Sequence, residues 1–200
     1  MRILGIDPGL DGGIALLDSH AGLAVEVIPT IGTKRREVDG AALAHIIDAW
    51  RPDHAYLEKV GSRPGQGVRS MFTFGCTVGV VKGVLGALEI PFSEVLPQEW
   101  QSVVCAGCRS GDPKGAALIR ARQLFPKQSF LATRLSKKPH RGLVDAACLA
   151  EYGHRICHHT ATASCGPETI TVQRIEAEGN AEIRRVMLER YNENKGDPKP

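Results

Sequence analysis

Short apolar runs alternate with longer stretches of helical periodicity over the first 160 residues of the chain. Aliphatic runs that end at Gly, Pro or charged residues predict strands at 2–6, 14–18, 22–30, 54–60 and 91–97. Apolar residues at helical spacing predict helices at 41–50, about 70–89, 97–104, about 114–124 and about 142–158. Short glycine-bearing turns join the first three strands and indicate an antiparallel meander. The order predicts an α/β domain in which helices flank a central five-stranded mixed sheet.

The composition of the chain changes at about Ala161, where a linker of small residues begins. A short amphipathic segment and a polar, proline-ended tail follow it. We therefore expect a working domain over residues 1–160. Residues 161–200 are expected to form a linker and a short helical or flexible C-terminal tail.

Overall composition narrows the class of protein only slightly. Apolar residues make up 42% of the chain, and the net charge of +3 permits a nucleic-acid partner without requiring one. No stretch approaches the roughly 18 apolar residues of a membrane span, and no signal peptide is evident. We expect a cytoplasmic protein that has no membrane partner.

Six cysteines raise the alternative of a structural zinc site. Cys105 and Cys108 have metal-ligand spacing, and the segment from Cys157 to Cys165 could supply partners. The spacing is irregular and lacks a clean second pair, which favours reduced cysteines without zinc.

The predicted helix at 70–89 carries four glycines on one face, at positions 75, 79, 83 and 86. Each glycine weakens a helix, so the pattern indicates close approach of another backbone. Packing of this face on the protein's own sheet is the favoured interpretation. A seam between two copies of the chain is the alternative.

Three acidic residues stand in apolar surroundings near the ends of predicted elements: Asp7, Glu58 and Asp145. Because an unpaired charge there is costly, we expect the three to share a divalent metal such as Mg²⁺. Gly12 and Gly13 are expected to let a substrate backbone approach. Asp11, in the same turn, is expected to be a turn former rather than a ligand.

Five sequence blocks together resemble RuvC-type Holliday-junction resolvases of the RNase H-like nuclease superfamily, and most resemble the phage and plastid-like branch. The resemblance spans about residues 1–155, and its blocks are GIDPGLDGGIALLD, YLEKVGSRPGQGVRSMFTFGCTVGVVKGVL, VLPQEW, ALIRARQLFP and HRGLVDAACLAEYG. It implies an RNase H-like fold, a homodimer, and cleavage of four-way DNA junctions that uses two Mg²⁺ or Mn²⁺ ions.

The resemblance also implies roles for individual residues. Asp7, Glu58 and Asp145 match the metal-binding carboxylates of the family. The family places a fourth ligand three or four residues before the last Asp, where this chain has Gly142 and Arg141. The candidate here is His140, which could instead contact phosphate. Gln101 stands after Trp100, where the family often has a phosphate-binding Lys.

Basic residues cluster in loops expected to flank the acids, and they are candidates for DNA-phosphate contacts, although such clusters are often only solvated surface. They are Lys34, Arg35, Arg36, Arg63, Arg69, Arg134, Lys137, Lys138 and Arg141. Residues 62–69 are expected to form a flexible element that orders on DNA. Phe72 or Phe74 could wedge into a junction, but core packing is the favoured interpretation for both.

The leading hypothesis is therefore a metal-dependent endonuclease acting on four-way DNA junctions. One alternative is a branched-DNA-binding protein of the same fold that has little or no activity. Another is a phosphotransferase of the actin and sugar-kinase class, which DPGLDGG alone suggests and which 200 residues hardly accommodate.

Overall fold

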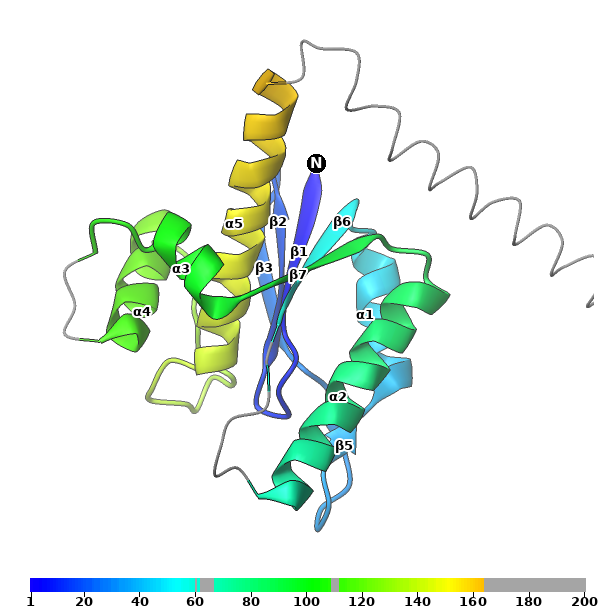
Figure 1. Cartoon of the computed structure of the whole chain (residues 1–200). Helices are drawn as coiled ribbons and strands as arrows, with labels where there is room; N and C mark the ends of the chain where they lie inside the picture. The colour runs from blue at the N-terminus through cyan, green and yellow to red at the C-terminus, as the bar shows by residue number, and fades with distance from the viewer. Residues whose placement is uncertain (60, 62–66, 109–111, 164–200) are drawn as a thin grey trace, which may run out of the picture. The chain divides into compact units, whose positions relative to one another are not determined.

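The computed structural model describes residues 1–59, 61, 67–108 and 112–163 (Figure 1). Its strands are β1 (Arg2–Asp7), β2 (Gly13–Asp18), β3 (Gly22–Val27), β4 (Thr30–Ile31), β5 (Glu37–Val38), β6 (His54–Glu58) and β7 (Phe92–Val95). Its helices are α1 (Gly40–Trp50), α2 (Val68–Ala87), α3 (Pro97–Val104), α4 (Pro113–Leu124) and α5 (Arg141–Ala163). Residues Met1–Cys157 form one compact unit. The predicted domain boundary at residue 160 stays a prediction.

A five-stranded mixed sheet with the order β3-β2-β1-β6-β7 forms the centre of this unit. β3, β2 and β1 are antiparallel, as the meander predicts, whereas β6 and β7 run parallel to β1. The predicted α/β class and five-stranded sheet are confirmed. The strand predicted at 22–30 is too long, because β3 ends at Val27 and the chain then forms a separate β4–β5 hairpin.

Helices cover both faces of the sheet, and alternate strand residues show which face each helix covers (Figure 1). Ile3 and Tyr56 pack in one cluster with residues of α3, α4 and α5. Leu4 and Leu57 pack in the other cluster with residues of α1 and α2. Because strand side chains alternate between faces, the nearly continuous apolar runs of β1 and β6 are those of strands buried on both sides.

Sequence signals define the ends of several helices. The Asp39 side chain accepts a hydrogen bond from the Ala42 amide and caps the start of α1. The Asp112 side chain caps α4 in the same way. α1 ends at Trp50, and Arg51, which caps it, adopts a left-handed conformation just before Pro52. α5 continues to Ala163, past its predicted end at 158.

The glycine face of α2, which consists of Gly75, Gly79, Gly83 and Gly86, does not pack on the sheet. A Cβ atom built at any of the four would meet nothing within 4 Å among the other residues. The favoured interpretation of these glycines is therefore wrong. Val81 and Leu85, on the opposite face of α2, make the contact with the core.

α2 is also more apolar than the composition suggested. By length and composition alone it could cross a membrane. Only 17% of its apolar 18-residue stretch is buried within the protein. The expectation that no stretch approaches the length of a membrane span is wrong for this segment. An exposed apolar helix face of this kind often marks a site that contacts another protein or a membrane.

Candidate carboxylate site and basic groove

Parallel pairing of two strands places the first two acidic residues side by side. Ile6 of β1 is in register with Leu57 of β6, and Asp7 and Glu58 are the next residues along the two strands. The carboxyl ends of parallel neighbours share one edge of a sheet. The sheet thus brings Asp7 and Glu58 together, as the sequence predicts.

The first turns of α5 bring Asp145 to the same edge. A Cβ atom on Gly13 would lie 2.7 Å from the Gly142 carbonyl oxygen, which shows how closely α5 packs on the turn before β2. A Cβ atom on Gly12 would lie 2.6 Å from the Gly9 carbonyl oxygen. The expectation that Gly12 and Gly13 make room for a substrate is therefore wrong, because protein backbone already occupies that space.

The pKa of Asp7 reflects its burial and the nearness of the other two carboxylates. Burial, together with the negative charges of Glu58 and Asp145, raises the pKa of Asp7 from 3.8 to about 7. The Gly9 amide, 3.4 Å from Oδ1, and the Arg141 guanidinium act in the opposite direction but do not cancel the rise. A divalent cation would relieve this repulsion.

Two of the carboxylates have other partners in the structure. The indole Nε1 of Trp100 donates a hydrogen bond to Glu58 Oε1 at 3.0 Å. Arg141 Nε lies 3.5 Å from Asp145 Oδ2, one helical turn away. Trp100 belongs to a block that carries the family resemblance, yet its contact with Glu58 was not predicted.

The site fits a hard divalent cation by its donor chemistry and by its charge. Three carboxylates on rigid elements are the donor set that Mg²⁺ or Mn²⁺ prefers, and the pKa of one of them, Asp7, is raised by burial and by the charges of the other two. Among the described residues, however, no group of three or more His, Cys, Asp or Glu side chains is arranged to hold a metal ion. The carboxylates are therefore grouped but not assembled as a set of ligands.

His140, the candidate fourth ligand, immediately precedes α5. Its amide donates to the Phe130 carbonyl oxygen at 2.6 Å, and its carbonyl accepts from the Val144 amide. In the described part of the chain, its Nδ1 atom is buried and has no hydrogen-bond partner. The role of His140 stays a prediction.

Of the two positions at which the resemblance predicts a fourth ligand, residue 142 has no room for a side chain. A Cβ atom on Gly142 would lie 2.6 Å from the Cα of Gly12 and 2.7 Å from the carbonyl oxygen of Asp11. The departure from the family pattern at residue 142 therefore has a structural cause.

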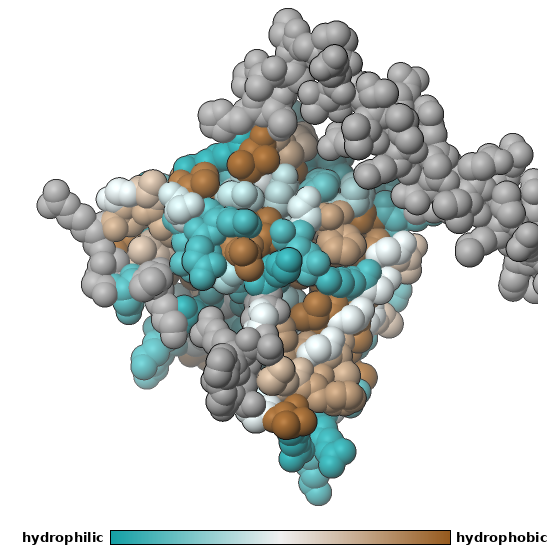
Figure 2. Space-filling model, viewed as in Figure 1, coloured by the Kyte–Doolittle hydropathy of each residue, from teal (hydrophilic) through white to brown (hydrophobic). Residues whose placement is uncertain are grey.

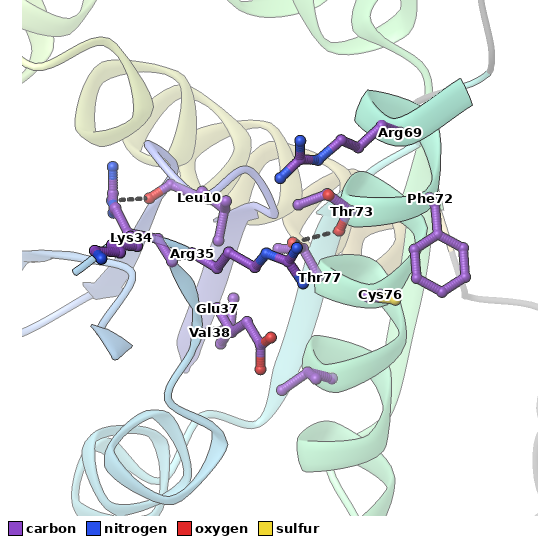
Figure 3. Close-up of a pocket in the computed structure, with 12 residues that line it drawn as sticks. Leu10, Lys34, Arg35, Glu37, Val38, Arg69, Phe72, Thr73, Cys76 and Thr77 are labelled. Carbon is purple, nitrogen blue, oxygen red and sulfur yellow. Dashed lines mark hydrogen bonds between the residues drawn. The ribbon is translucent and has the colours of Figure 1, made fainter. Parts of the chain in front are cut away.

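A groove of about 570 Å³ lies beside this site, between the β4–β5 hairpin and the first half of α2 (Figure 3). Leu10, in the turn after Asp7, forms part of its wall. Arg35 from the hairpin and Arg69 from α2 extend into the same space near Thr73 and Thr77. The groove combines cationic side chains, hydroxyls and an apolar wall, as nucleic-acid-binding surfaces do.

Arg36 holds the hairpin on the turn after β1. Its guanidinium bonds to Asp11 Oδ1 at 2.8 Å and to the Leu10 carbonyl oxygen at 2.7 Å. Asp11 is exposed and its carboxylate forms an ion pair with Arg36 of the hairpin, so its expected role as a turn former stays a prediction. Arg36 contributes to the shape of the groove as well as to its charge.

The other predicted DNA contacts lie on different segments. Arg134, Lys137 and Lys138 are exposed in the loop before α5, and Arg141 is exposed at the start of that helix. Lys34 is exposed at the groove. Arg63, and with it most of the element expected to order on DNA, lies outside the described residues.

The two phenylalanines that open α2 differ in burial. Phe72 is 74% exposed, and Phe74 is partly buried. Core packing, the favoured interpretation for both, is therefore wrong for Phe72.

The described cysteines provide no metal site. Cys76, Cys105, Cys108, Cys148 and Cys157 are all free cysteines. Within the described ranges, none of these cysteines belongs to a group of three or more His, Cys, Asp or Glu side chains that could hold a metal ion. Cys165 lies outside these ranges.

Comparison with known proteins identifies the fold. The structure is similar to that of Thermus thermophilus RuvC, with a TM-score of 0.51 and 17% identity over 78% of this chain and 97% of that one. It is also similar to T. thermophilus RuvC in complex with a Holliday junction substrate, with a TM-score of 0.55 and 15% identity over 80% and 96% of the two chains. No model of a protein family and no curated protein matches the sequence. The chain therefore has the RNase H-like fold of RuvC.

Proposed function

We propose that this protein is a divalent-metal-dependent endodeoxyribonuclease that resolves four-way DNA junctions by paired hydrolysis of phosphodiester bonds. The observation that carries the proposal is the grouping of Asp7, Glu58 and Asp145 at one edge of the sheet, where their charges help to raise the pKa of Asp7 to about 7. The RuvC fold and the adjoining basic groove support it.

In this proposal Asp7, Glu58 and Asp145 hold two Mg²⁺ or Mn²⁺ ions. Bound ions would supply Lewis-acid stabilisation of the charge that develops on the phosphate. Asp7 must lose its proton before it can act, and Asp145 must turn from Arg141 toward the other carboxylates. His140, which immediately precedes α5, is proposed as a further ligand or a phosphate contact. The expected products carry a 5′-phosphate and a 3′-hydroxyl.

The DNA is proposed to cross the groove and the loop before α5. Lys34, Arg35 and Arg69 would contact phosphates on one side of the carboxylates. Lys137, Lys138 and Arg141 would contact them from the other loop. Phe72, exposed beside Arg69, is an apolar side chain that could enter the opened centre of a junction.

A homodimer would supply the paired cuts that resolution requires. The exposed face of α2 is suited to such an interface, because Val68 and Phe72 continue the line of its four glycines. Figure 2 shows this face as a pale and brown band along α2. If a second copy covers α2, no membrane is needed to bury its apolar residues, and we propose a cytoplasmic protein.

The side-chain arrangement at the site favours one alternative function. Because no three ligands are assembled for a metal among the described residues, the protein could bind branched DNA without cutting it. Asp7→Asn separates the two functions. We expect this variant to lose junction cleavage while its affinity for the junction is unchanged, and loss of both together would contradict the role assigned to Asp7.

A further inference from the structure

Trp100 connects the core of the protein with a carboxylate of the site. The residue is fully buried in α3, in the cluster formed with α4 and α5. Its indole Nε1 donates to Glu58 Oε1 at 3.0 Å. A buried indole N–H requires an acceptor, and here the acceptor is a residue of the proposed active site.

The backbone fixes the indole on the same strand ends that carry the acids. Glu58 is in register with Val95, and the Lys59 amide donates to the Val95 carbonyl oxygen at 2.7 Å. α3 begins two residues later at Pro97, and the Glu99 carboxylate caps it by accepting from the Leu96 amide at 2.9 Å. Trp100 thus occupies the first turn of a capped helix anchored directly to the β6–β7 pair.

The hydrogen bond is compatible with a working orientation of Glu58. The charge of Glu58 is the largest electrostatic contribution to the raised pKa of Asp7. The Glu58 carboxylate therefore accepts from the indole and is also close enough to Asp7 to act on its charge.

We propose that Trp100 is a positioning residue, which orients the Glu58 carboxylate for metal binding by donating its indole N–H to Oε1. The inference rests on the proposed function, because it assigns Glu58 to the metal site. Donors of this kind fix the orientation of a ligand before the metal arrives, and their loss typically weakens metal affinity or activity by about 10–100-fold.

The chain contains two tryptophans, so the indole N–H resonances of the whole protein provide a direct test. Trp50 lies on α1, at the opposite face of the sheet, and serves as an internal control. We expect Mg²⁺ to shift the Trp100 resonance saturably in the absence of DNA and to leave the Trp50 resonance in place. Glu58→Gln should abolish the response. A Trp100 resonance that does not move at Mg²⁺ concentrations that support cleavage would overturn the proposal.

A second measurement separates positioning from packing. Trp100→Phe keeps a buried ring but removes the donor together with part of the ring volume, whereas Val104→Ala removes buried volume from the same helix and leaves the donor in place. Trp100→Phe should raise the Mg²⁺ concentration for half-maximal junction cleavage about tenfold or more, and Val104→Ala should leave it unchanged. Equal shifts in the two variants would show a structural role only.

The same data distinguish failure of the inference from failure of the proposed function. If the wild-type protein cleaves junctions but Mg²⁺ does not shift its Trp100 resonance, the positioning role alone is overturned. A Trp100 resonance that responds to Mg²⁺ through Glu58, in a protein that cuts no junction, supports the positioning role and overturns the nuclease. Absence of both the response and cleavage overturns both.

Discussion

Gly142 of α5 packs directly against Gly12 of the turn after β1, so that a Cβ atom on Gly142 would lie 2.6 Å from the Gly12 Cα. This contact between two backbones sets the position of α5 on the sheet. Because Asp145 lies one turn further along α5, the same contact determines how close its carboxylate comes to Asp7 and Glu58.

Gly142→Ala should therefore damage both the fold and the site. Forcing a methyl group into this contact is expected to lower the free energy of unfolding by about 1–3 kcal/mol, and to reduce cleavage more than DNA binding. Urea unfolding and a junction-cleavage assay measure the two effects. Gly86→Ala, in α2, is the matched control for the unfolding measurement alone, because a Cβ atom there meets nothing within 4 Å. Similar tolerance of both substitutions would contradict the account.

The raised pKa of Asp7 predicts that the metal-free protein loses stability as the pH rises. Between about pH 4 and pH 7 the folded protein holds a proton on Asp7 that the unfolded chain has released, so the free energy of unfolding should fall across this range. Asp7→Asn removes this cost and should be more stable than the wild type at pH 8, by roughly 2–4 kcal/mol. Urea unfolding in the presence of a chelator at pH 5 and pH 8 measures both effects. A wild type that grows more stable relative to Asp7→Asn as the pH rises would contradict the assignment.

The groove arginines should determine the salt dependence of DNA binding. Replacing both Arg35 and Arg69 with Ala is expected to weaken junction binding and to reduce the slope of log affinity against log salt by about 0.9 for each phosphate that the protein no longer neutralises. Titrations at several salt concentrations measure the slope. Arg122→Ala, at an exposed position on α4, should leave it unchanged. A double variant that binds like the wild type would place the DNA elsewhere.

A larger side chain on the glycine face of α2 should preserve or raise the stability of the monomer but weaken the association of the dimer. Gly79→Leu places a large side chain in open space, so the monomer should keep its stability or gain up to about 1 kcal/mol of helix propensity. In a dimer that packs through this face, the same side chain should separate the two helices. Sedimentation equilibrium of the wild type, Gly79→Ala and Gly79→Leu should show dissociation that increases with the size of the side chain. Unchanged association in Gly79→Leu would exclude this face as the interface.

The sequence predicted the main strands and helices because each has a strong local signal. The apolar runs at 2–6 and 54–60 identified two strands and the acids near their ends. The β4–β5 hairpin was missed, because strands of two residues have no periodicity to detect.

Long-range contacts account for the other differences. The spacing of the α2 glycines showed that they share a face but not whether anything packs on it. In the same way, the sequence pointed to a substrate beside Gly12 and Gly13, whereas the backbone of the turn itself and of α5 fills that space. The hydrogen bond from Trp100 to Glu58 joins residues on two different elements, and no local pattern predicts it.

Cleavage of a synthetic mobile four-way junction, beside a linear duplex of matched sequence, tests the central claim most directly. With Mg²⁺ or Mn²⁺ the account predicts symmetric nicks in the junction alone, and no nicks with Asp7→Asn. Tight binding of the junction without cleavage by the wild type in either metal would contradict the account and identify a protein that only recognises branched DNA.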